Sequence, residues 1–176
     1  MDDKMKRFLI LIVLVLTGCG DNEVAASPAT ESPEAEPHAV EQLSTDEIME
    51  QVNASGKITD AQAESLNKVS SLYLDGLTSM TDTQAERLSK VEYLRLNGLT
   101  SITDAQAECL SKVKFLELNR LTTITDAQAE SLSRCSTLDL NGLTTITDAQ
   151  AVSLSKVRSL HISKTLQPLI DKYKNQ

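Results

Sequence analysis

The chain has 176 residues, of which 24% are charged and 3% are aromatic, and its formal net charge is -8. This length leaves room for one domain, and the acidic balance argues against a nucleic-acid-binding protein, because phosphate neutralisation requires a basic surface. The two His and three Cys have no spacing typical of zinc or haem ligation, so neither a metal nor a cofactor is expected.

Residues 1–19 predict a signal peptide that ends at a lipidated cysteine. Basic residues precede an apolar run of nine, Phe8 to Leu16, which is too short to span a bilayer as a helix. Leu16-Thr17-Gly18-Cys19 then resembles the bacterial lipobox, in which the signal is cut before Cys and the thiol carries a diacylglycerol. This resemblance implies a membrane-anchored lipoprotein of the bacterial cell envelope, and an ordinary secretory signal is the alternative.

Two features near this segment bear on its processing. Gly20 follows Cys19 where Asp would favour inner-membrane retention, so the resemblance implies the outer membrane in a Gram-negative cell. Asp2 and Asp3 are atypical of a signal's first residues and indicate a translation start at Met5, although Met1 stays open.

Residues 20–43 predict a disordered acidic tether. The segment contains three Pro, many Ala, Ser and Glu, and no Lys or Arg. Such a composition cannot bury enough apolar surface to offset the chain entropy lost on folding. His38 lies alone within it and is interpreted as solvated. The acidic residues from Asp21 to Glu47 account for most of the net charge, which therefore belongs mainly to this stalk.

Residues 44–55 predict an N-terminal cap. Ser44 and Glu47 have the spacing of a capping box, and Ile48, Met49 and Val52 give the following helix an apolar face.

Residues 56–165 contain an internal repeat with a period of 22 residues. The five units begin at Gly56, Thr78, Thr100, Thr122 and Thr144. A repeat of this length is typical of a solenoid, in which each unit buries its apolar face against its neighbours.

Each unit predicts one short helix and one strand. In the third unit Thr103 and Gln106 form a capping box, and Ala107 and Leu110 lie on one helix face. In the second unit the phrase V-x-x-L-x-L sends alternate leucines inward and the residues between them outward.

The units resemble leucine-rich repeats, most closely the cysteine-containing subclass known from F-box proteins, with its L-x-x-L-x-L and I-T-D phrases. The resemblance implies an α/β solenoid with a parallel sheet on the concave side and short helices on the convex side. The Asn or Cys that usually bonds the loop backbone is replaced by Leu in four units and Thr in the fifth, which leaves the usual side-chain ladder in doubt. Asn97, Asn119 and Asn141 occur two residues earlier, where a turn role is expected.

Residues 166–176 predict a C-terminal capping helix, because Leu166, Leu169, Ile170 and Tyr173 replace the I-T-D phrase.

The outward strand positions vary most between otherwise similar units. Aromatic, basic and acidic residues at such positions are typical of partner surfaces. The residues predicted to bind a partner are Tyr73, Tyr93, Arg95, Phe115, Glu117, Asp139 and His161. The alternative is a solvated sheet face on which nothing constrains the residue type.

Other candidate sites receive less support. The Asp that follows each capping Thr favours a helix-start role over calcium binding. Cys109 is placed on a helix exterior and Cys135 in the core, which predicts two free thiols. His161 has no Ser or Cys partner at a spacing that indicates nucleophilic catalysis, so an enzyme is not expected.

We therefore expect a lipid-anchored protein that binds another protein through the concave face of its sheet. The alternative is a structural envelope protein that self-associates without a specific ligand.

Overall fold

The computed structural model describes residues 43–174. The predicted signal peptide, Cys19, His38 and the tether up to residue 42 lie outside these residues, as do residues 175 and 176. The helices are α2 (Thr45–Ser55), α3 (Asp60–Leu66), α4 (Asp82–Leu88), α5 (Asp104–Leu110), α6 (Asp126–Leu132), α7 (Asp148–Leu154) and α8 (Gln167–Lys174). The strands are β1 (Ser71–Tyr73), β2 (Tyr93–Arg95), β3 (Phe115–Glu117), β4 (Thr137–Leu140) and β5 (Ser159–Ile162).

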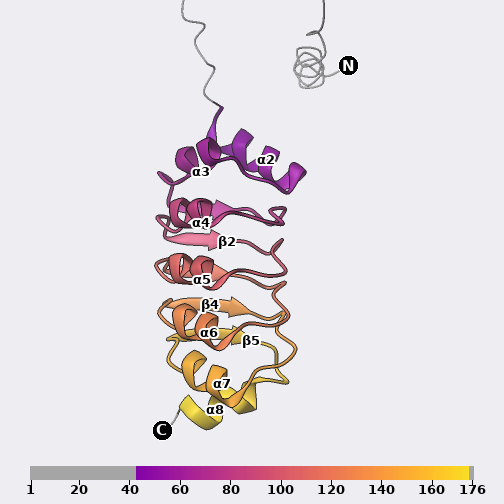
Figure 1. The fold of residues 1–176 in the computed structure, drawn as a ribbon, viewed down its shortest axis with the longest axis vertical. Coiled ribbons are helices and arrows are strands. Elements are labelled where there is room, and N and C mark those ends of the chain that lie inside the picture. The colour runs from indigo at the N-terminus through magenta and orange to yellow at the C-terminus, as the bar shows by residue number, and fades with distance from the viewer. Residues whose placement is uncertain (1–42, 175–176) are drawn as a thin grey trace, which may run out of the picture. The chain divides into compact units, whose positions relative to one another are not determined.

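The five strands form one parallel sheet in the order β1-β2-β3-β4-β5. In neighbouring strands, each residue pairs with the residue 22 positions later in the chain, as Tyr93 does with Phe115 and Arg95 with Glu117. Neighbouring helices pack against each other in the same order, and Figure 1 shows the repeats stacked one above the next. The predicted α/β architecture of stacked strand-and-helix units is therefore confirmed.

The repeated Thr-Asp-x-Gln phrase starts each helix of the array, as predicted. In α5 the hydroxyl of Thr103 accepts a hydrogen bond from the amide of Gln106, and Oε1 of Gln106 accepts one from the amide of Thr103. Equivalent capping boxes begin α3, α4, α6 and α7. These bonds satisfy amides that a helix terminus otherwise leaves without a partner.

The glutamine of this phrase also joins successive repeats. Nε2 of Gln106 donates to the carbonyl of Met80 at 2.8 Å, and Nε2 of Gln128 donates to the carbonyl of Ile102 at 2.9 Å. Both side chains are buried, so the bonds satisfy groups that are costly to leave unpaired. One residue thus caps its own helix and links that helix to the preceding unit.

The core lies between the sheet and the helices. Leu94 and Leu96 of the second unit are fully buried. Leu116 and Leu118 of the third unit are at most 1% exposed. Each such side chain contributes roughly 1.5–3 kcal/mol through burial. The inward direction of alternate leucines agrees with the sequence prediction.

Helices close both ends of the core. Ile48 and Val52 of α2 are buried, and Ser44 caps this helix together with Glu47 as predicted. Ile170 of α8 is buried against the last unit, while Leu160 of β5 remains half-buried. Within the described residues, no helix combines the length and apolar character needed to cross a bilayer.

The two cysteines of the array are free thiols. Cys135 is buried, as predicted for the position that Val occupies in other units, and burial raises its pKa to about 12. Cys109 lies half-buried on α5.

Candidate binding face

The side of the sheet away from the helices, here called the open face, presents three columns of side chains. All seven residues predicted to bind a partner lie on it, and each is half-buried or exposed. The first column is Ser71, Tyr93, Phe115, Thr137 and Ser159. The second is Tyr73, Arg95, Glu117, Asp139 and His161. The third column lies just after the strands and consists of Asp75, Asn97, Asn119, Asn141 and Ser163.

Three aromatic rings follow one another across the first three strands. The ring centroids of Tyr73 and Tyr93 are 5.5 Å apart, and those of Tyr93 and Phe115 are 6.3 Å apart. Both pairs are tilted, an arrangement that is favourable beyond the area buried. Tyr73 is 45% exposed, so the row offers an apolar surface to solvent.

Arg95 is held in place by an acidic residue and by a ring. Its Nε donates to Oδ1 and Oδ2 of Asp75 at 2.9 and 2.8 Å, and its Nη2 also contacts Oδ2. The guanidinium carbon lies 5.0 Å from the Tyr73 ring centroid, within cation–π range. Hydrogen bonding to Asp75 raises the pKa of Arg95. Exposed ion pairs add little stability, so the pair mainly fixes the orientation of the guanidinium.

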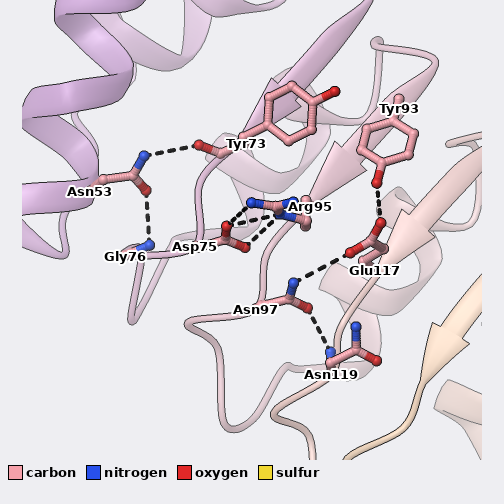
Figure 2. A network of polar contacts seen from close by, with 9 residues as sticks. All are labelled: Asn53, Tyr73, Asp75, Gly76, Tyr93, Arg95, Asn97, Glu117 and Asn119. Atoms are coloured by element: carbon pink, nitrogen blue, oxygen red, sulfur yellow. Dashed lines mark hydrogen bonds and ion pairs between the residues drawn. The ribbon is translucent and has the colours of Figure 1, made fainter.

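A second chain of hydrogen bonds crosses from β2 to β3. The hydroxyl of Tyr93 donates to Oε1 of Glu117, and Nδ2 of Asn97 donates to Oε2 of the same carboxylate at 3.4 Å. Oδ1 of Asn97 accepts from the amide of Asn119 at 2.9 Å, which completes the network in Figure 2. The hydrogen bond to Glu117 and, to a smaller extent, the burial of the phenol raise the pKa of Tyr93 to about 12.

The asparagines of the third column form a ladder that the sequence analysis missed. Oδ1 of Asn97 accepts from the amide of Asn119, and Oδ1 of Asn119 accepts from the amide of Asn141 at 3.0 Å. Asn53 of α2 extends the pattern, because its side chain bonds the carbonyl of Tyr73 and the amide of Gly76 (Figure 2). Asn97, Asn119 and Asn141 lie at turns, as predicted, but they also join repeats. The signal was present in the sequence as Asn recurring at intervals of 22 residues.

Asp139 and His161 occupy the last two strands of the second column. Burial raises the pKa of Asp139, and Asn119 and His161 oppose this shift. Oγ of Ser159 lies 3.4 Å from Nε2 of His161, a neighbour that the sequence spacing did not indicate. The carboxylate of Asp139 instead accepts from Asn141. Within the described residues, no hydrogen bond joins the Asp139 carboxylate to the His161 ring. Ser159, His161 and Asp139 therefore do not form the hydrogen-bonded chain of a catalytic triad.

The helix-start aspartates have hydrogen-bond partners of their own. The carboxylates of Asp82, Asp104 and Asp126 each accept from the capping Thr of the next unit, at 2.8 to 3.2 Å. Asp60 accepts from Gln84 at 2.9 Å, and Asp148 pairs with Lys172 at 3.6 Å. The row therefore joins successive repeats, in agreement with the helix-start role.

Most polar groups on and beside the first three strands of the open face are thus oriented by hydrogen bonds within the chain. Comparison of the chain with family models, with curated proteins and with solved structures returned no match.

Proposed function

We propose that the chain is a leucine-rich-repeat lipoprotein of the bacterial envelope that binds another protein through the open face. The observation that carries the proposal is the distribution of variation. Leucine, glutamine and threonine recur at the buried and capping positions, whereas the open face changes from Tyr and Arg to Glu, Asp and His along the array. Stacking alone accounts for the recurring residues but not for this change.

The bonding of the variable residues supports the same proposal. Aromatic and Arg side chains dominate binding energy at protein interfaces, and fixing them beforehand lowers the entropy lost on association. Tyr93 is held by the carboxylate of Glu117 on β3, and Arg95 by that of Asp75 just beyond β1. A surface that only meets water needs no such arrangement.

The size of the open face predicts a weak contact. The three columns cover five residues of each unit, about 17 Å, across five strands about 4.8 Å apart, and so offer on the order of 400 Å². A standard interface uses about 800 Å² per partner. Anchoring through a lipid on Cys19 would raise the local concentration of the protein and offset the small area.

Replacement of Tyr93, Arg95 and Phe115 together by Ala tests the proposal. Crosslinking in native envelopes should capture the partner with the unchanged protein and not with this variant. The matched control replaces the exposed residues Glu86 and Val152 by Ala, on the helix side. Equal capture by all three proteins would exclude the open face as the binding surface.

One observation favours a second function, a structural protein that self-associates. The amides of Leu74, Leu96 and Leu118 each donate to the next strand at 2.8 to 2.9 Å. Ile162 holds the same repeat position in β5, which is the last strand of the sheet. An open strand edge can pair with a second copy. A mass in solution that rises with protein concentration would support this function, and a constant monomer mass would exclude it.

A further inference from the structure

We infer that the open face takes a cationic side chain of its partner, an ammonium or guanidinium group, between Glu117 and Asp139. This inference rests on the proposed function and names the chemistry of the partner segment, which must present a Lys or Arg to β3 and β4.

The charges on the open face are not all balanced by ion pairs within the described residues. Asp75 is neutralised by Arg95, with which it forms an ion pair. Glu117 accepts hydrogen bonds from the phenol of Tyr93 and the side-chain amide of Asn97. Asp139 accepts hydrogen bonds from the side chains of Asn141 and Asn119. Within residues 43–174, neither Glu117 nor Asp139 forms an ion pair. The middle of the face therefore has two carboxylates without a bound cation.

These two carboxylates are direct neighbours. Glu117 and Asp139 are paired in the register of β3 and β4, so they lie on the same side of strands about 4.8 Å apart. Like charges directly opposite each other on a sheet are destabilising. Burial raises the pKa of Asp139, the hydrogen bond from Asn119 and the neighbouring His161 lower it, and Glu117 raises it again, so the second carboxylate adds to the cost of keeping Asp139 charged. A cation between them removes this repulsion.

The aromatic row supplies the second element of the site. Phe115 precedes Glu117 by two residues on β3, so its ring lies on the same face. Nζ of Lys114 is 5.5 Å from the Phe115 ring centroid, and Arg95 lies over Tyr73. Rings of this face therefore already attract cations of the chain itself. The aliphatic part of a partner's Lys or Arg can pack on the ring while its charged end reaches the carboxylates.

An acidic partner fits the same surface less well. Arg95 is the permanently charged cation of the three columns, and Asp75 already neutralises it. His161, the register partner of Asp139, is the other basic side chain of the columns. Arg120 and Lys164 are exposed, but they lie at the turns that follow the strands. Charge complementarity at the centre of the face thus favours a basic segment of the partner. Preferential binding of an acidic peptide is the contrary outcome of the test described next.

The test uses the full chain in detergent micelles and three labelled peptides of equal length, with alternating Lys and Ser, Arg and Ser, or Glu and Ser. Fluorescence anisotropy gives the Kd of each peptide. The variant Glu117→Gln with Asp139→Asn removes both charges and keeps the side-chain shapes. The control Glu108→Gln with Glu130→Gln removes the same charge from exposed positions on α5 and α6, also 22 residues apart.

We expect the Lys and Arg peptides to bind and the Glu peptide not to bind. The face variant should raise the Kd of the basic peptides about tenfold, since it removes charge-assisted contacts, and the control should leave it within about twofold. A photo-crosslinker on the Lys peptide should label β3 or β4 of the unchanged protein, a readout that needs no variant. Equal weakening by both variants, labelling confined to the helices, or tighter binding of the Glu peptide would overturn the inference.

Capture of the native partner separates this inference from the proposed function. If replacement of Tyr93, Arg95 and Phe115 abolishes capture but Glu117→Gln with Asp139→Asn leaves it unchanged, the open face binds the partner and the cation site is wrong. If the basic peptides bind as expected but native capture survives every change on the face, the cation site stands and the proposed function falls.

Discussion

The hydroxyl of Tyr93 donates a hydrogen bond to the carboxylate of Glu117 on the neighbouring strand. Both residues vary between repeats and both point away from the core, so the bond connects two side chains that stacking does not require. It also gives the open face a spectroscopic signature. A phenol beside a carboxylate loses its proton at a higher pH than a phenol in water.

Glu117→Gln should lower the pKa of Tyr93 from about 12 toward 10.0. The absorbance of tyrosinate measures this titration, with Tyr73 and Tyr173 replaced by Phe to remove the other phenols. Because the native state holds the proton more tightly, this bond's contribution to stability is complete below pH 10.0 and is lost as the pH approaches about 12. An unchanged titration curve in the variant would mean that the bond does not form in solution.

Gln128→Ala should destabilise the array by about 2 kcal/mol. The variant loses the bond from the Thr125 amide at 3.0 Å and the bond to the Ile102 carbonyl at 2.9 Å, both involving a buried side chain. Urea unfolding gives the free energy. The matched control is Gln62→Ala, whose half-buried side chain bonds Gln51 rather than a backbone carbonyl. We expect about 1 kcal/mol there, and equal losses at the two sites would contradict a role for the buried inter-repeat bond.

Asn119→Ala should cost about 1 kcal/mol and expose one amide. The side chain accepts from the amide of Asn141, and this amide has to find another partner once the acceptor is removed. Hydrogen exchange at Asn141 should therefore quicken, while exchange at buried Leu138 changes in proportion to global stability only. Asn119→Asp keeps the acceptor oxygen and should retain the protection. Fast exchange in both variants would count against the ladder.

The thiols should differ in reactivity. Only the thiolate attacks electrophilic reagents, and burial raises the pKa of Cys109 and, more strongly, that of Cys135 to about 12. With Cys19 replaced by Ser, a folded sample at mildly alkaline pH should react slowly at Cys109 and not at Cys135. Cys109→Ser isolates the buried thiol, which should react only after denaturant is added. Rapid modification of that thiol in the folded variant would show that Cys135 is not in the core.

The helix starts and the buried leucines were predictable because both depend on local periodicity. The Thr and Gln three residues apart define a helix start, and Leu94 and Leu96 point to one side of a strand whatever lies beyond it. The residues of the open face were predictable for the same reason. Comparing the repeats with one another separated the variable positions from the recurring ones without any homologue.

The contacts between repeats were not predictable in the same way. A single unit shows Gln106 as a capping residue, but its second bond goes to a carbonyl 26 positions earlier, which becomes a neighbour only after stacking. Pairing of Arg95 with Asp75 rather than with Glu117, its register partner, depends on side-chain direction in the folded sheet. The proximity of Ser159 and His161 likewise follows from strand geometry.

The buried glutamine bonds have a consequence for how this protein can change in length. Each of the four junctions between successive units uses the same amide-to-carbonyl contact and the same register, so these contacts recur whichever units meet, while the bonds of the open face depend on the units. A gene duplication or deletion of 22 codons in phase leaves every remaining junction intact. Its effect is to lengthen or shorten the open face by one strand, about 4.8 Å, and to add or remove one set of variable side chains.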